Sequence, residues 1–232
     1  MASRLSEFIT TNQLLYKGQY GFRNKHSTQM AIIEMIDKIH SAMEREEYTF
    51  GLFLDYRKAF DTVNHTLLLA KLEYYGIRGI NNQWFKSYLT DRTQYTTYNG
   101  TRSDINSVNC GVPQGSILGP LLFIIYINDM NLISDDTSLI LFADDTNVFM
   151  SHNNLPKLEH MANRELKKIF DWTISNRLSL NLKKTMYMIF QPRKNKLLHN
   201  MNIKVDNTSL DTLEYQISVS TRLFFRDRKS VV

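Results

Sequence analysis

The chain has little cysteine, proline or glycine. Its 232 residues include one cysteine, four prolines and nine glycines. A single cysteine, Cys110, excludes an internal disulfide and a zinc site built from several thiolates. The most apolar stretch, residues 121–127, is far too short to cross a bilayer, so we expect no membrane segment. The sequence also has no internal repeat and no low-complexity linker, which favours one compact domain.

What remains is the composition of a folded protein with a modest basic excess. Hydrophobic residues make up 43% of the chain and aromatic residues 12%, which excludes wholesale disorder. The formal net charge is +5. This charge is compatible with a polyanionic partner, although it does not prove one.

Two adjacent carboxylates, Asp144 and Asp145, lie between the apolar runs 139–142 and 148–150. This pattern predicts two buried strands joined by a tight turn with both acids at its tip. Neighbouring carboxylates in a hydrophobic hairpin repel each other and are partly desolvated. Either one of them takes up a proton or a divalent cation lies between them. Because Asp-Asp is also common in ordinary turns, the pair alone does not establish a catalytic site.

A third carboxylate, Asp55, directly follows the apolar run 50–54. The run predicts a core strand that delivers Asp55 to the edge of a sheet. Three acids from two strand ends are oxygen ligands of the kind that Mg²⁺ prefers. Two such ions can stabilise both the attacking and the leaving oxygen of a phosphoryl transfer.

Local signals predict most of the regular elements. Ser27 or Thr28 is a good N-cap for a helix over residues 31–39, and Asn99-Gly100 is the strongest hairpin signal in the chain. Apolar periodicity predicts further helices over 66–75, 84–89, 121–129 and 155–178, and a strand over 186–190.

A glycine-rich segment over residues 110–120 precedes the apolar helix expected at 121–129. Such a segment lets a ligand approach main-chain N–H groups closely. It lacks the Gly-Lys-Ser/Thr ending of a P-loop, which excludes that type of nucleotide site. Arg23, Lys25 and His26 lie just before the helix expected over residues 31–39. They form either a phosphate-facing surface near its N-terminus or a set of solvated loop charges.

Five segments, in this order, resemble the reverse transcriptase domain of non-long-terminal-repeat retrotransposons, with group II intron enzymes as more distant relatives. They are Gln-Tyr-Gly-Phe-Arg and its continuation over 19–28, Leu-Asp-Tyr-Arg-Lys-Ala-Phe-Asp at 54–61, Gly-Val-Pro-Gln-Gly-Ser-Ile-Leu-Gly-Pro at 111–120, Phe-Ala-Asp-Asp at 142–145, and Leu-Asn-Leu-Lys-Lys-Thr at 180–185. The resemblance covers roughly residues 5–192. Chance agreement of five ordered motifs is negligible.

The resemblance implies an α+β fold, the right-hand polymerase palm, in which helices pack on one face of an antiparallel sheet. It implies partial fingers over residues 1–50, a palm with the catalytic motifs over 51–192, and a degenerate C-terminal tail over 193–232. Family members carry a longer fingers region, with an arginine that grips the triphosphate, and a helical thumb. We expect both the fingers arginine and the thumb to be missing here.

The same resemblance implies roles for individual residues. Asp55, Asp144 and Asp145 would be catalytic and would bind two Mg²⁺ ions, with Mn²⁺ as a substitute. Lys184 would protonate the leaving pyrophosphate. Phe60 would be a steric gate, because an aromatic ring under the incoming sugar clashes with a 2′-hydroxyl.

The substrate-binding residues are implied in the same way. Main-chain N–H groups between Tyr56 and Phe60 would face the phosphates. Pro113, Gln114 and Gly115 would line the nucleotide and template side of the pocket. Arg23 would contact the template or the nucleotide.

The function that follows from the resemblance is RNA-directed DNA polymerisation, with an RNA template, a DNA primer and deoxynucleoside triphosphates as partners. The alternative is an inactive remnant that at most binds nucleic acid, which the missing fingers arginine and thumb favour. An RNA-dependent RNA polymerase shares the acids, but the aromatic side chain of Phe60 argues against ribonucleotides. The family's working place is the nucleus, where we expect this chain; the oligomeric state is not predicted.

Overall fold

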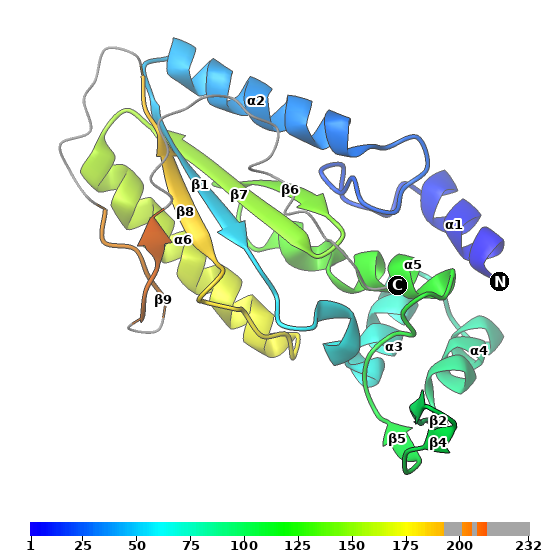
Figure 1. Cartoon of the computed structure of the whole chain (residues 1–232). Helices are drawn as coiled ribbons and strands as arrows, with labels where there is room; N and C mark the ends of the chain where they lie inside the picture. The colour runs from blue at the N-terminus through cyan, green and yellow to red at the C-terminus, as the bar shows by residue number, and fades with distance from the viewer. Residues whose placement is uncertain (193–200, 206–207, 213–232) are drawn as a thin grey trace.

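The computed structural model describes residues 1–192, 201–205 and 208–212, and a five-stranded sheet lies at its centre (Figure 1). The strand order is β11-β8-β1-β7-β6. The strands are β1 (Tyr48–Leu54), β6 (Ser138–Phe142), β7 (Asp145–His152), β8 (Met186–Phe190) and β11 (Asp211–Thr212). β1 is antiparallel to both β7 and β8, β6 and β7 form a hairpin, and β11 runs parallel to β8.

Helices cover both faces of this sheet. On one face, α6 (Leu155–Ser175) contacts β1 and β7, and its buried side chains join the main core with those of α3 (His65–Tyr74) and α5 (Leu118–Tyr126). On the other face, α2 (Thr28–Glu44) contacts β1 and β6 over a second, smaller core. Figure 1 shows α2 and α6 on opposite sides of the strands. The α+β class is therefore confirmed, and α2 adds a cover on the face that was expected to be open.

Shorter elements surround this centre. They are α1 (Ala2–Thr11), the 3₁₀ helices η1 (Ala59–Thr62) and η2 (Asn128–Leu132), α4 (Ile80–Leu89), β2 (Arg92–Gln94), β3 (Thr97–Tyr98), β4 (Thr101–Arg102), β5 (Asn106–Val108), β9 (Lys204–Val205) and β10 (Thr208–Ser209). Strands β2 to β5 form two small antiparallel pairs beyond α4. No helix in the described ranges has the length and apolarity that crossing a membrane requires.

Local sequence signals predicted the β3–β4 turn and the start of α2. Asn99 and Gly100 have φ values of 46° and 77° between β3 and β4, as a primed turn requires. Ser27 is the N-cap of α2, and its side chain accepts a hydrogen bond from the Met30 N–H. Helix α5 begins at Leu118, earlier than expected, because Pro120 is tolerated in the first turn of a helix.

The core is continuous across the boundaries expected at residues 50 and 192. Leu5 and Ile9 of α1 lie in the same core as the strands, and so do Met201 and Ile203. The first 50 residues therefore pack as part of the domain, and so does part of the predicted tail. The rest of that tail, 193–200, 206–207 and 213–232, lies outside the described residues.

Candidate active site

The three predicted catalytic acids lie at one end of the sheet. Asp55 directly follows β1, and Asp144 and Asp145 lie where β6 turns into β7. The register pairs Leu54 with Thr146, so the next residues along the two strands are Asp55 and Asp145. Residues directly opposite each other on antiparallel strands point to the same face of the sheet. All three acids are partly exposed.

The structure brings these acids to one place without assembling them around a common point. Within residues 1–192, 201–205 and 208–212, no three His, Cys, Asp or Glu side chains converge as a metal cluster. The donor set nevertheless fits Mg²⁺, which takes oxygen ligands and usually binds through one or two carboxylates plus substrate phosphates. Asp55, Asp144 and Asp145 are the residues that could hold it.

The turn that carries the acidic pair has an unusual backbone. Phe142 pairs with Asp145, which leaves Ala143 and Asp144 as the two turn residues. Ala143 has a φ of 57°, in the left-handed region that L-residues other than Gly, Asn and Asp rarely adopt. Its conformation therefore depends on support from its surroundings.

The segment 18–21 supplies that support by running beside β6. The Tyr20 N–H donates to the Leu141 carbonyl at 2.7 Å. The buried Gln19 side chain accepts hydrogen bonds from the N–H groups of Gly21, at 2.8 Å, and Ala143, at 3.4 Å. A Cβ atom on Gly21 would lie 2.2 Å from the Ala143 nitrogen, so only glycine fits there. The motif at 19–28 thus braces the turn that carries Asp144 and Asp145.

The motif at 180–185 holds Asp55 from the other side. The Asn181 Nδ2 donates to Asp55 Oδ2 at 2.9 Å, and the Asn181 N–H donates to the Asp55 carbonyl at 2.7 Å. The Asp55 N–H donates to the Oγ1 of the buried Thr185 at 3.3 Å. Lys184 is exposed on this turn, and its N–H donates to the Asn181 carbonyl at 2.9 Å. The predicted proton donor therefore lies on the turn that contacts Asp55.

Phe60 lies in η1, a few residues beyond Asp55, and is partly exposed. Its ring stacks on Phe123 of α5, with centroids 4.3 Å apart and an interplanar angle of 24°. The exposed Phe22 meets it edge-on at 6.2 Å. These contacts fix the ring plane, which a steric gate requires.

The glycine-rich segment packs on η1. The Gly111 N–H donates to the Val63 carbonyl and the Val112 N–H to the Phe60 carbonyl, both at 2.8 Å. Gly111 has a φ of 88°, and a Cβ there would lie 2.8 Å from the Asp61 carbonyl oxygen. The segment therefore approaches η1 as closely as a glycine allows.

This packing sets the three predicted pocket residues beside η1. The Gln114 Nε2 donates to Asp61 Oδ1 at 2.7 Å. Pro113 is partly exposed, and Gln114 and Gly115 are exposed. The motifs at 54–61 and 111–120 are thus neighbours in space.

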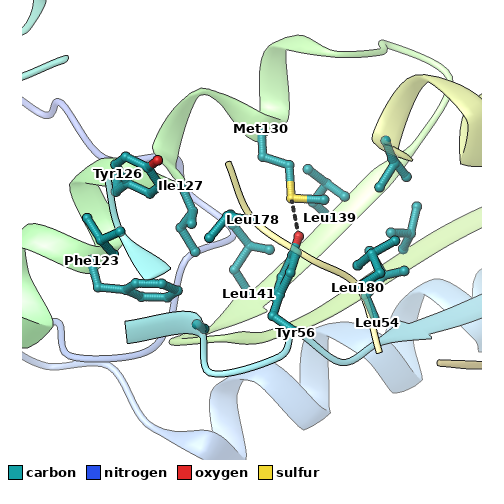
Figure 2. Close-up of a cluster of buried hydrophobic side chains, with 14 of the residues drawn as sticks. Leu54, Tyr56, Phe123, Tyr126, Ile127, Met130, Leu139, Leu141, Leu178 and Leu180 are labelled. Atoms are coloured by element: carbon teal, nitrogen blue, oxygen red, sulfur yellow. Dashed lines mark hydrogen bonds between the residues drawn. The ribbon is translucent and has the colours of Figure 1, made fainter. Parts of the chain in front are cut away.

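Tyr56 has its side chain in the core. Its hydroxyl points at the Met130 sulfur, 3.7 Å away, among leucines that include Leu54 and Leu180 (Figure 2). Burial raises the pKa of Tyr56. The Tyr56 side chain is therefore shielded from a substrate, and the predicted contact of the main chain with the phosphates stays a prediction. In the same stretch the Arg57 N–H already donates to the Ser179 carbonyl at 2.8 Å.

Arg23 has a structural contact in this fold. Its Nη1 donates to the carbonyls of Tyr16 and Gln19, each at 3.0 Å. Burial lowers the pKa of Arg23. The guanidinium thereby stabilises the loop that carries Gln19, and its predicted contact with template or nucleotide stays a prediction.

Exposed cations lie next to Asp55. Arg57 and Lys58 follow Asp55, and Lys183 and Lys184 lie on the neighbouring turn, which is joined to the first segment by the bridge between Tyr56 and Leu180. Lysine and arginine side chains beside a carboxylate are suited to a polyanion that approaches with its own metal counterions.

Sequence reasoning missed Asn181 and Gln19 as site residues. Both belong to motifs that the resemblance identified, but no role followed for either one from the residues themselves. One signal could have identified them: each has an amide side chain, which can donate and accept hydrogen bonds, within a few residues of a predicted functional side chain. Their partners lie 126 and 124 residues away, so the contacts needed the fold.

Comparisons with known proteins identify the family of this chain. Residues 1–217 match the family model described as reverse transcriptase (RNA-dependent DNA polymerase). The RNA-directed DNA polymerase from the mobile element jockey of Drosophila melanogaster is 31% identical over 82% of this chain and 22% of its own length. The probable RNA-directed DNA polymerase from transposon X-element of the same fly is 34% identical over 62% of this chain and 16% of its own length. The chain thus spans about a fifth of the length of these relatives.

Solved structures show the same fold at low sequence identity. Apo telomerase from Candida tropicalis, truncated from its C-terminal domain, matches with a TM-score of 0.60 at 12% identity over 84% of this chain and 40% of that chain. Telomerase from Candida albicans, in complex with a fragment of telomeric RNA, matches with a TM-score of 0.59 at 14% identity over 86% of this chain and 36% of that chain. With the family model matching most of the sequence, this chain belongs to the reverse transcriptase (RNA-dependent DNA polymerase) family, and its relatives are enzymes of non-long-terminal-repeat mobile elements.

Proposed function

We propose that this chain is an RNA-directed DNA polymerase domain that transfers deoxynucleotides to a primer 3′-hydroxyl by two-metal chemistry. The observation that carries the proposal is the register of β1 and β7: Leu54 pairs with Thr146, Asp55 directly follows Leu54, and Asp145 directly precedes Thr146. Acids from two separate motifs thus lie at the same end of one sheet, and Phe60 belongs to the motif that carries Asp55. The names of the relatives, which are RNA-directed DNA polymerases, support the same reaction.

The residues of the chain divide the work between binding, selection and proton transfer. Asp55, Asp144 and Asp145 would hold two Mg²⁺ ions, which when bound supply activation of the 3′-hydroxyl and stabilisation of the leaving oxygen. Asp55 keeps its orientation through Asn181. Phe60 excludes a 2′-hydroxyl. The Lys184 ammonium gives a proton to the departing pyrophosphate.

The remaining groups position the substrates. Pro113, Gln114 and Gly115 line the nucleotide and template side, because their segment packs on η1 next to Phe60. The exposed cations beside Asp55 attract the RNA template and the DNA primer. A telomerase neighbour of this fold was solved with a fragment of telomeric RNA, which supports RNA as the template.

The test is extension of a DNA primer on an RNA template by the purified chain. We expect Mg²⁺-dependent incorporation of deoxynucleotides that Asp144→Asn and Asp145→Asn each slow by at least about a hundredfold. Asp91→Asn, which removes an exposed carboxylate before β2, is the matched control and should extend primers like the unmodified chain. A folded chain that extends no primer at any Mg²⁺, Mn²⁺ or primer concentration would contradict the proposal.

An inactive remnant that only binds nucleic acid is the second candidate, favoured by the net charge of +5. Purely electrostatic attachment weakens steeply as salt rises. Binding of an RNA–DNA duplex that disappears between low and physiological salt, in the absence of extension, would identify this second function.

A further inference from the structure

Asn181 is the polar side chain that reaches the Asp55 carboxylate from a distant part of the chain. Its Nδ2 donates to Oδ2 at 2.9 Å across a sequence separation of 126 residues. A carboxylate only accepts hydrogen bonds, so the amide nitrogen of Asn181 must face it. A hydrogen bond to an ionised acceptor is about twice as strong as one between neutral groups. The contact therefore restricts how the carboxylate can rotate.

The main chain of Asp55 makes two further hydrogen bonds to this turn. The Asn181 N–H donates to the Asp55 carbonyl at 2.7 Å, and the Asp55 N–H donates to Thr185 Oγ1 at 3.3 Å. The Lys184 and Thr185 N–H groups both donate to the Asn181 carbonyl at 2.9 Å. The turn thus forms through main-chain groups, which survive a change of the Asn181 side chain. The side-chain amide, in contrast, contacts the carboxylate itself.

We infer that Asn181 is a positioning residue that orients the Asp55 carboxylate for a divalent cation. This inference rests on the proposed two-metal site, since it assigns the geometry of one ligand of that site. Ligating carboxylates are commonly held by outer hydrogen-bond partners, and loss of such a partner costs about 10- to 100-fold in metal affinity or activity. Because the Asp55 side chain is already held in one orientation, it loses less rotamer entropy when it binds the cation.

The experiment measures Mn²⁺ binding to the full 232-residue chain without primer, template or nucleotide. Mn²⁺ suits carboxylate and water ligands, and the electron paramagnetic resonance signal of the free ion reports its concentration directly. The component of binding that Asp55→Asn removes defines the site. Asn181→Leu keeps the side-chain size but has no donor, and we expect it to weaken that component by about tenfold or more.

Asn82→Leu is the matched control for a purely structural effect. The Asn82 Nδ2 donates to the carbonyls of Leu69 and Ile77 at 2.9 and 3.1 Å, away from the acids. We expect this variant to melt at a lower temperature and to bind Mn²⁺ like the unmodified chain. Asn181→Leu, in contrast, should bind Mn²⁺ more weakly than the unmodified chain. The measurement is made well below the melting temperature of the variant, where the chain is fully folded.

Three results would overturn the inference. Equal Mn²⁺ affinity in Asn181→Leu and the unmodified chain would do so while leaving the polymerase proposal intact. Equal loss of affinity in Asn181→Leu and Asn82→Leu would show a general structural effect. Absence of any Asp55-dependent Mn²⁺ binding would also overturn it, whereas the proposed function is judged separately by primer extension.

Discussion

At the turn that carries Asp144 and Asp145, the backbone conformation restricts which residues fit at positions 143 and 21. Ala143 holds a left-handed φ of 57° directly before Asp144, and Gln19 accepts its N–H. Gly21 passes the same nitrogen so closely that no side chain fits between them. Conformations of this kind cost about 1–3 kcal/mol each and persist only where the surrounding structure imposes them. The brace at residues 18–21 therefore matters to the geometry of the acids as well as to stability.

Gly21→Ala tests the brace. The added Cβ would lie 2.2 Å from the Ala143 nitrogen, so segment 18–21 and the turn between β6 and β7 must move apart. We expect a loss of about 1–3 kcal/mol in the free energy of unfolding, measured by urea denaturation, together with weaker Mn²⁺ binding. Gly100→Ala is the control, because a Cβ there meets nothing within 4 Å and only its φ of 77° is unfavourable. It should leave Mn²⁺ binding unchanged. Unaltered stability in Gly21→Ala would show that the brace is not tight.

Phe60→Val tests the sugar gate. The smaller side chain removes the ring that stacks on Phe123 and opens space for a 2′-hydroxyl. We expect the preference for deoxynucleotides over ribonucleotides, measured as a ratio of kcat/KM values, to fall by more than about tenfold. Phe22→Leu removes only the edge-on neighbour and should change that ratio much less. An unchanged ratio in Phe60→Val would exclude the gate.

Individual helices offer tests of how the sequence specifies its elements. The N-cap of α2 was predicted to be Ser27 or Thr28, and the structure selects Ser27. Ser27→Ala should lower the free energy of unfolding by about 1 kcal/mol, because the Met30 N–H loses its acceptor. Thr28→Ala should stay within about 0.5 kcal/mol of the unmodified chain. Thermal or urea unfolding distinguishes them, and the opposite order would contradict the assignment.

Helix α6 gives a pH dependence. Glu165 accepts hydrogen bonds from Arg164 at 2.6 Å and Lys168 at 3.0 Å. Burial alone would raise the pKa of Glu165, but the neighbouring polar and cationic groups, Lys168 and Arg164 among them, outweigh it and lower the pKa. The folded-state pKa therefore lies below the unfolded value of about 4.3. The ionised carboxylate stabilises the fold above that value, and this stabilisation is lost as the pH falls through the folded-state pKa.

Glu165→Gln should accordingly be less stable than the unmodified chain at pH 7. The difference should shrink from pH 7 towards pH 3, because the unfolded chain takes up a proton at this carboxyl below about pH 4.3. Urea unfolding at the two pH values measures it. Glu44→Gln changes an exposed carboxylate at the end of α2 and should have little effect at either pH. A difference for Glu165→Gln that is the same at pH 7 and pH 3 would contradict the ionised, stabilising role.

At the scale of elements, the sequence predicts what is locally encoded. Apolar periodicity placed α6 and β8, and Asn99-Gly100 placed the hairpin of β3 and β4, because these signals act over a few residues. The order of helices and strands followed from the same patterns. The start of α5 was placed too late, since its proline was taken to precede the helix.

Contacts between distant segments needed the structure. The pairing of 18–21 with β6, the packing of 111–115 on η1, and the Asn181 amide on Asp55 each join parts of the chain that no periodicity connects. The resemblance assigned a main-chain role to the stretch from Tyr56 to Phe60 and a substrate contact to Arg23, but it did not indicate that the side chains of Tyr56 and Arg23 make structural contacts. The motifs that lie together at one end of the sheet were identified from the sequence, and the hydrogen bonds that join them were not.

As a whole, the described part of the molecule is a sheet with helices on both faces. Asp55, Asp144 and Asp145 lie at one end of this sheet. The main core lies under α3, α5 and α6, and the smaller core lies under α2. Because both faces are buried, the site can open only along the strand ends and the loops that follow them. Four of the five recognised motifs, 19–28, 54–61, 142–145 and 180–185, meet there, and the fifth packs on η1 beside them.

The central claim is that acids from two separate motifs act at one polymerase site. The most direct test is a double-mutant cycle on Mg²⁺-dependent extension of a DNA primer on an RNA template, with Asp55→Asn, Asp145→Asn and the combined variant. Each single variant should lose at least about a hundredfold in rate. The combined variant should be no slower than the worse single one, because groups that act as a unit are strongly non-additive. Losses that multiply, or a single variant that extends primers like the unmodified chain, would contradict a shared site.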